Sequence, residues 1–447
     1  MFPMKKKNLF LFFISIINLN LITFNQSNQI IFTFKTKSIN VESSKYIEAI
    51  IDNHIYITPE IGQPPQKINI YLTTKTGSFI IADSSIDSSF FNKEESTTYL
   101  NTSGLEQFYL EFFLKGYYAN ESFTFQTSID NSNKQTYNNV EFIHVIEFKD
   151  NNEIASGYFG LQLEKKINLN VFNCLKKINA ISSYVWYLNY TSDSEGYLAI
   201  GEFPPEYNNT ETLRKSNPLP CTEGNTNNLC WYLKFNDIYF GNIKLSRERT
   251  AKISPELGVI IGTNEYKKKI EENYFNKTLK NQCALQLSDN NNYYYYECDK
   301  NADISSFKDL TFSHQEFMYD FVLTKDDLFK VYRDKLYFLI VFNSFAYYGN
   351  NWRLGKPFIK KYNFIFKTDS ELIYFYNNKE EDSSINNKGE SNLIYWIIIG
   401  ILGLCVIIMV VLILYKVFFK PKKKKANELK EDIDYTNVDK NENALGI

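Results

Sequence analysis

The sequence predicts a mostly β protein. Three stretches, 67–72, 233–240 and 362–366, alternate apolar and polar residues with the two-residue period of half-buried strands. The chain holds 37 Phe and 33 Tyr residues, which suit pleated surfaces. Clusters of Asn, Asp and Gly separate these stretches and are typical of turns. The sequence suggests only short helices, with candidates at 171–178 and 264–275.

Composition excludes several classes of protein. The 447 residues include 49 basic and 51 acidic side chains, a net charge of −2, which excludes a strongly basic nucleic-acid-binding protein. A hydrophobic content of 44% excludes a chain that is disordered throughout. The histidines, His54, His144 and His314, are far apart in sequence, and no pair of cysteines has CxxC spacing. We therefore expect no metal site and no cofactor.

The two ends predict a membrane protein that crosses the bilayer once. Residues 1–26 have a basic start and an apolar stretch typical of a signal peptide, with an uncleaved signal anchor as the alternative. Residues 393–415 are uncharged and slightly longer than the roughly 20 residues that span a bilayer. Six lysines at 416, 420 and 422–425 mark the tail, 416–447, as cytoplasmic. We expect a type I topology, with a lumenal or extracellular ectodomain and a polar stalk at 379–392.

Sequons and cysteines agree with an oxidising compartment. Glycosylation sequons begin at Asn101, Asn120, Asn189, Asn208 and Asn276. Closeness in sequence predicts two local disulfides, Cys221–Cys230 and Cys283–Cys298, and leaves Cys174 as a buried or free thiol.

Several motifs of the predicted ectodomain resemble those of one protein family. The stretch YITPEIGQPPQ at 56–66, followed by LTTKTGS at 72–78, resembles the opening strand of the pepsin-like aspartic proteases. Further matches in the same order are SGYFGL at 156–161, EGYLAIG at 195–201 and WRLGKPF at 352–358. The resemblance covers about Ile51 to Tyr376. It implies a bilobal pepsin-like double β-barrel, with lobes at 51–204 and 205–378 and an interlobe cleft. Residues 27–50 would be a lead segment or a propeptide remnant.

The resemblance also shows what the active site lacks. Aspartic proteases use two Asp carboxylates about 3 Å apart that share one proton. Without a gap, Thr73 stands at the first Asp position; a two-residue insertion would place Lys75 there instead. Ser254 stands at the second Asp position, followed by Pro255 and Glu256. We expect a Thr73–Ser254 hydrogen bond in place of the carboxylate pair, with Lys75 reaching a carbonyl or Glu256.

These features predict a membrane-anchored pseudoprotease that binds peptide or protein segments as a monomer. Lys75 and Arg353 would give the cleft floor a preference for acidic peptides. The alternatives are an active aspartic endopeptidase of the secretory or endolysosomal pathway, and a surface glycoprotein with an unused cleft. Two further alternatives would restore chemistry: a new dyad of Asp83 and Glu256, the nearest carboxylates in sequence, or a pairing in which Lys75 activates Ser254. The predicted cleft residues are Thr74, Lys75, Thr76, Gly77, Tyr109 (at the flap tyrosine position), Glu256 and Arg353.

Overall fold

The computed structural model describes residues 29–376, apart from 38, 52–53, 110–112, 131, 149–154, 164–169, 205–206, 208–212, 222–228 and 346–350. The predicted signal peptide, stalk, membrane span and cytoplasmic tail lie outside these residues. Within the described part of the chain, no helix is both long enough and apolar enough to cross a membrane.

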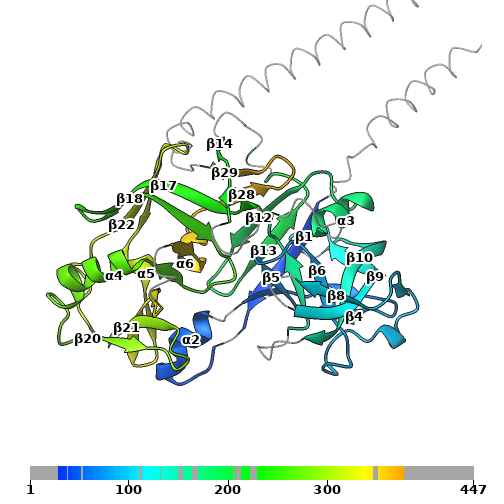
Figure 1. Ribbon diagram of the computed structural model, residues 1–447, viewed down its shortest axis with the longest axis horizontal. Coiled ribbons are helices and arrows are strands. Elements are labelled where there is room, and N and C mark those ends of the chain that lie inside the picture. Colours follow the sequence, from blue (N-terminus) through cyan, green and yellow to red (C-terminus); the bar gives the residue numbers. More distant parts are fainter. Residues whose placement is uncertain are drawn as a thin grey trace, which may run out of the picture. The chain divides into compact units, whose positions relative to one another are not determined.

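Two large sheets form the framework, and each belongs mainly to one half of the chain (Figure 1). The first has 16 strands, and its path β14-β29-β28-β12-β13 includes two strands, β28 and β29, from the second half of the sequence. Its strands are β1 Ile30–Thr36, β2 Ile55–Ile57, β3 Glu60–Ile61, β4 Gln66–Lys67, β5 Ile70–Thr73, β6 Phe79–Ala82, β7 Leu100–Asn101, β8 Glu106–Tyr109, β9 Phe113–Gln126, β10 Lys134–Phe148, β11 Gly157–Gly160, β12 Val185–Tyr190, β13 Glu195–Ile200, β14 Leu213–Ser216, β28 Phe364–Lys367 and β29 Leu372–Tyr376.

The second sheet has 11 strands and carries the core of the second lobe. Its strands are β17 Tyr232–Phe240, β18 Ile243–Ile253, β19 Ile260–Gly262, β20 Cys283–Leu287, β21 Tyr293–Asp299, β22 Leu310–His314, β23 Tyr319–Leu323, β24 Phe329–Tyr332, β25 Lys335–Phe338, β26 Ile340–Asn343 and β27 Trp352–Leu354. A separate pair joins β15 (Leu219–Pro220) to β16 (Leu229–Cys230).

Helices are short and lie at the ends of strands. Several begin at a side-chain cap: Asn170 accepts from the amide of Phe172 (3.0 Å), Thr263 from that of Tyr266 (3.2 Å) and Asn92 from that of Glu94 (3.1 Å). The helices are η1 Ser43–Lys45, α2 Tyr46–Ile51, η2 Lys93–Glu95, α3 Val171–Lys177, α4 Asn264–Ile270, the π-helical turn η4 Glu271–Phe275, α5 Lys325–Leu328 and α6 Lys356–Ile359.

The predicted mostly β, two-lobed architecture is confirmed, with small shifts at element ends. The stretch predicted at 233–240 lies within β17, and both predicted helices form, at α3 and at α4 with η4. The strand predicted at 67–72 is instead divided between β4 and β5, with Ile68 and Asn69 between them.

Aromatic rings pack the two lobes together. Trp186 of β12 stacks on Phe366 of β28 with ring centroids 4.0 Å apart, and Trp231 meets both rings edge-on at 6.0 and 5.0 Å. Such pairs stabilise by about 1 kcal/mol beyond their burial. The two sheets therefore share one continuous core rather than two separate ones.

The N-terminal segment links the lobes a second time. Strand β1 pairs with β13 and β2 in the first sheet. Residues 39–51, which we call the N-terminal strap, then pack on the second lobe, where Ile47 and Ile50 share a core with β19 and β21. Figure 1 shows helix α2 of the strap beside β21. Tyr332 fixes the strap, because its hydroxyl accepts from the amide of Val41 (3.1 Å) and donates to its carbonyl (2.9 Å).

Candidate active-site region

The first turn, residues 73–78, joins β5 to β6 and is capped by its own hydroxyls. The amide of Lys75 donates to Thr73 Oγ1 (3.1 Å), and the amide of Ser78 donates to Thr76 Oγ1 (3.1 Å). Thr73 is 4% exposed, while Lys75 is half-buried. The side chain of Lys75 forms no ion pair or hydrogen bond with any residue that the structure describes. The turn is thus rigid at its backbone and holds one uncompensated cation.

The second turn, residues 254–259, joins β18 to β19 and lacks such caps. The amide of Leu257 donates to the carbonyl of Ser254 (3.0 Å), which closes the turn through the backbone alone. Ser254 is 1% exposed, and its hydroxyl has no hydrogen-bond partner in the described part of the chain. A buried hydroxyl without a partner destabilises the folded state.

Each turn packs against one glycine from a neighbouring strand. A Cβ on Gly160 would lie 2.5 Å from the carbonyl oxygen of Thr76. A Cβ on Gly355, which directly follows β27, would lie 2.5 Å from the carbonyl oxygen of Leu257, and it would lie closer still, 2.0 Å, to that of Val259. Only glycine allows the backbone to approach this closely. The two contacts fall on corresponding residues, because Thr76 and Leu257 are each the fourth residue of their turn.

The strand registers agree with this correspondence. Strand β11 runs parallel to β5 and pairs Gly160 with Thr73, and β27 runs parallel to β18 and pairs Leu354 with Ile253. Because Ser254 follows Ile253 and Gly355 follows Leu354, Ser254 stands in its turn where Thr73 stands in the first. The same correspondence relates Lys75 to Glu256.

Glu256 reaches from the second turn to the first. Its carboxylate accepts from the hydroxyl of Thr74 (3.0 and 3.1 Å) and, more weakly, from the Thr74 amide (3.4 Å). The expected Thr73–Ser254 hydrogen bond is wrong, since the Ser254 hydroxyl has no described partner. The expectation that Lys75 contacts Glu256 is wrong as well, because Thr74 takes that place. The side chain of Glu256 is long enough to reach the opposite turn, whereas the shorter side chains of Thr73 and Ser254 do not form a hydrogen bond with each other.

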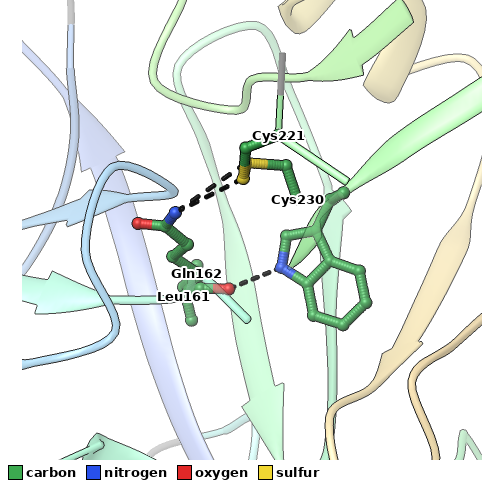
Figure 2. The surroundings of a disulfide bond; sticks show 5 residues. Leu161, Gln162, Cys221 and Cys230 are labelled. Atoms are coloured by element: carbon green, nitrogen blue, oxygen red, sulfur yellow. Dashed lines mark hydrogen bonds between the residues drawn. A yellow bond between two sulfur atoms is a disulfide. The ribbon is translucent and has the colours of Figure 1, made fainter. Parts of the chain in front are cut away.

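A chain of hydrogen bonds also connects the bases of the two turns, and Figure 2 shows its middle link, from the indole to the carbonyl of Leu161. The amide of Leu161 donates to the carbonyl of Thr73 (2.7 Å). The carbonyl of Leu161 accepts from the indole nitrogen of Trp231 (2.6 Å), and the carbonyl of Trp231 accepts from the amide of Ile253 (2.9 Å). This chain fixes the position of one turn relative to the other.

A comparison of the chain with models of known protein families identifies the family of this domain. The model of the eukaryotic aspartyl proteases matches residues 54–377. The chain belongs to this pepsin-like family. No curated protein matches the chain.

The first predicted disulfide of this aspartyl-protease domain supports the first turn. Cys221 and Cys230 are bonded, and the side-chain amide of Gln162 points at their sulfurs from 4.0 and 3.8 Å (Figure 2). The backbone amide of Gln162 donates to the carbonyl of Thr76 (3.0 Å). The disulfide of the second lobe therefore packs on the segment that holds the turn of the first lobe.

The other cysteines also lie as predicted. Cys283 and Cys298 are bonded and stand opposite each other in β20 and β21. Cys174 is a free thiol and is buried in α3.

The remaining predicted cleft residues lie on defined elements. Tyr109 is the last residue of β8, which forms a hairpin with β9, and the residues that follow it, 110–112, lie outside the described part. Gly77 accepts at its carbonyl from the amide of Val171 (2.9 Å). Arg353 lies in β27, paired with Lys252 of β18, rather than in a loop.

Two residues near the turns escaped the sequence analysis. Lys252 is 5% exposed and stands two residues before Ser254 in β18. The strand pattern identifies buried positions by their apolar residues, so it does not indicate a buried lysine. Tyr190 ends β12 and is also near Glu256; burial raises its pKa, and the negative charge of Glu256 raises it further. Nothing in the alternating pattern of β12 distinguishes Tyr190 from an ordinary strand tyrosine.

The other carboxylate considered for a new dyad has a different partner. Asp83 Oδ2 lies 3.0 Å from His144 Nε2, and Asp83 Oδ1 accepts from the amide of Ser85 (2.8 Å). Tyr99 is bonded to the opposite nitrogen, Nδ1, of His144 (2.8 Å). Asp83 thus belongs to a buried polar cluster of the first lobe, whereas Glu256 belongs to the turns.

The sequons differ in accessibility. Asn101 and Asn276 are exposed. Asn189 donates to the hydroxyl of Tyr197 (2.9 Å), and the amide oxygen of Asn120 is buried in β9. Asn208 lies outside the described residues.

Proposed function

We propose that this pepsin-like domain is a non-catalytic module that binds peptide or protein segments between its lobes. The observation that carries the proposal is the pair of residues at the corresponding turn positions, Thr73 and Ser254, neither of which is an acid. Aspartic proteolysis needs one ionised carboxylate to take a proton from water and one protonated carboxyl group to donate to the substrate carbonyl. The hydroxyl groups of Thr73 and Ser254 do not ionise at the acidic pH at which these two proton transfers take place.

Glu256 does not replace the missing pair. It supplies a single carboxylate, and both of its oxygens already accept hydrogen bonds from Thr74. A lone carboxylate has no like-charged neighbour to divide the two pKa values, which is the source of acid and base roles in the family. The turns therefore favour structure and binding over hydrolysis.

The charge of the region suggests the kind of peptide. Lys75 is half-buried and has no ion-pair partner among the described residues, and it stands one residue from Thr74. Extended peptides bind sheet edges and clefts through their backbones, and side-chain charges then set the preference. We propose that acidic peptides bind best, with Lys75 as the main cation and Arg353 as a second one.

We also propose that this module is displayed on a membrane. The support is the uncharged stretch at 393–415, the lysines that follow it, and the signal-like start at 1–26. The exposed sequons at Asn101 and Asn276 would then carry glycans, because their side chains are accessible to the transferase. The module would act as a monomer that faces the lumen or the cell exterior.

Acid proteolysis tests the lack of activity. The purified protein is incubated with a casein substrate at acidic pH, with and without pepstatin, beside the double variant Thr73→Asp/Ser254→Asp. We expect no pepstatin-sensitive cleavage by the natural sequence. Cleavage that pepstatin blocks would overturn the proposal in favour of an active endopeptidase. Cleavage gained only by the double variant would support an intact framework around an inactive site.

Peptide binding tests the preference. Fluorescent pools of acidic, neutral and basic peptides are titrated with the natural protein, Lys75→Gln and the surface control Lys234→Gln. We expect the acidic pool to bind best and to lose about tenfold in affinity with Lys75→Gln alone. Equal binding of all pools, or equal losses in the two variants, would reject this preference.

A further inference from the structure

A cavity lies under the N-terminal strap. It has a volume of about 500 Å³, within the usual range for small-molecule sites. The strap, the turn at Asp193–Ser194 between β12 and β13, and α5, β24 and α6 of the second lobe all contribute to its walls. It touches the second turn only at Gly258, where a Cβ would lie 2.1 Å from the carbonyl oxygen of Ile50.

One side of this cavity, the strap cavity, is apolar. Tyr46 of the strap stacks on Tyr332 of β24 with ring centroids 4.1 Å apart, and both residues line the cavity. Ile39 and Leu339 are only partly buried where they line the cavity. The apolar lining residues are Ile39, Tyr46, Ile50, Phe329, Leu339 and Pro357.

The polar side carries more basic than acidic groups, and most of them are paired. Asp193 bonds to Lys330 (2.6 Å) and to Lys360, and Asp327 bonds to Lys361 (2.6 Å). The two lysines beside Asp193 hold the pKa of its carboxyl group well below the usual range. These groups are held in fixed positions by one another.

Lys37 and Lys356 are the exceptions, because neither side chain has an ion pair with the described residues, and of the two Lys37 is exposed to solvent. Lys356 is the one that the cavity wall covers. It is half-buried in the cavity wall, and it has no ion pair or hydrogen bond through its side chain with the described residues. Burial lowers the pKa of its ammonium group, and the neighbouring charges of Lys360 and Lys330 lower it further, while Asp193 acts in the opposite direction. An anionic group of a bound ligand would stabilise the charged form of this half-buried lysine.

We propose that the strap cavity binds a small amphipathic carboxylic acid, with the carboxylate on Lys356 and the apolar body against Tyr46, Ile50 and Leu339. The size, the apolar side with its tyrosine pair and one half-buried cation without an ion pair together define this ligand class. Because the walls come from the strap and from both lobes, a bound acid would hold the three together. The site is separate from the Thr73–Ser254 region, and it does not depend on the proposed peptide binding.

Calorimetric titration of the full-length protein with 4-phenylbutyrate tests the proposal. The uncharged analogue 4-phenylbutyramide is titrated in parallel, with Lys356→Gln, Lys75→Gln and Lys234→Gln as variants. We expect the acid to bind the natural protein at least about tenfold more tightly than the amide. Lys356→Gln should weaken the acid to the level of the amide and leave the amide unchanged. The other two variants should bind the acid as the natural protein does.

Four results would overturn the proposal. These are no binding of the acid at millimolar concentration, equal affinities for acid and amide, an unchanged affinity in Lys356→Gln, and a loss in Lys75→Gln instead, which would place the acid in the cleft. A second variant, Leu339→Trp, guards against misfolding of Lys356→Gln. It fills the apolar side without removing a charge, and it should weaken acid and amide alike. Peptide affinity should not change in Lys356→Gln.

Discussion

The two turns share a backbone and differ in chemistry. Each follows a strand of its own lobe, pairs through a parallel neighbour and packs on a glycine, Gly160 or Gly355. In the first turn, hydroxyls cap the turn itself. In the second, Ser254 has no described partner and Glu256 bonds to the opposite turn. The two turns thus share their strand pairing and glycine contacts while their side chains form different hydrogen bonds.

This difference separates two properties of the turns, which are the backbone framework that positions them and the chemistry of their side chains. The framework needs glycine at the closest approaches and fixed strand registers, and neither depends on a carboxylate. The hydrogen-bond chain from Thr73 through Leu161 and Trp231 to Ile253 uses backbone groups and one indole. The contacts that hold the two turns in place therefore do not require an acid at Thr73 or Ser254.

The largest effect should come from the two glycines. Gly160→Ala and Gly355→Ala each force a Cβ to within 2.5 Å of backbone atoms of a turn. Because backbone cannot move aside as a side chain can, we expect each to lower the free energy of unfolding by about 3 kcal/mol. Urea unfolding measures this, with Gly104→Ala as the control, since nothing lies within 4 Å of its Cβ position. Losses that differ greatly between the two would contradict the equivalence of the turns.

Acid should affect the second lobe through His314. Burial lowers the pKa of His314 from 6.5 to about 4, and its Nδ1 accepts from the amide of Phe317 (3.2 Å). The unfolded chain binds this proton below pH 6.5, so the stability that the neutral ring contributes is present above that pH. It is lost as the pH falls from 6.5 to 4, at up to about 1.4 kcal/mol per pH unit.

Unfolding in urea at pH 7 and pH 5 measures this loss. His314→Phe keeps the ring contacts and should reduce the pH dependence over that window. It should not abolish it, because burial also lowers the pKa of His144 in the first lobe, beside Asp83 and Tyr99. An unchanged slope in His314→Phe would show that other groups govern the acid response of the second lobe.

Much of the fold could be predicted from the sequence, whereas the contacts of the site could not. The period of two residues in β17 and the motif order gave the sheets and lobes, since both are local or linear signals. The partner of Glu256 is Thr74, 182 positions away, and no local pattern reports such a contact. The N-terminal strap escaped for the same reason, because Ile47 and Ile50 resemble any short apolar stretch until the second lobe covers them.

Glu256 should matter more than its counterpart Lys75. Glu256→Gln keeps the shape but replaces a charged acceptor of the Thr74 hydroxyl and amide, and we expect a loss of about 1.5 kcal/mol. Lys75→Gln removes a charge that has no described partner, and stability should change by less than about 0.5 kcal/mol. A double-mutant cycle with Thr74→Val isolates the bond, because the loss from Glu256→Gln should shrink once Thr74 is changed. Equal losses in Glu256→Gln and Lys75→Gln would remove the asymmetry between the turns.

The smallest effects should differ in sign. Thr73→Val keeps the side-chain shape but removes the oxygen that accepts from the Lys75 amide, so the free energy of unfolding should fall by about 1 kcal/mol. Ser254→Ala removes a buried hydroxyl without a described partner and leaves no donor or acceptor unpaired. It should therefore be neutral or stabilise the protein by up to about 1 kcal/mol. Thermal and urea unfolding of the two variants side by side measure both signs. If Ser254→Ala destabilises as much as Thr73→Val, the serine hydroxyl has a partner in solution, and the two turns are more alike than their contacts indicate.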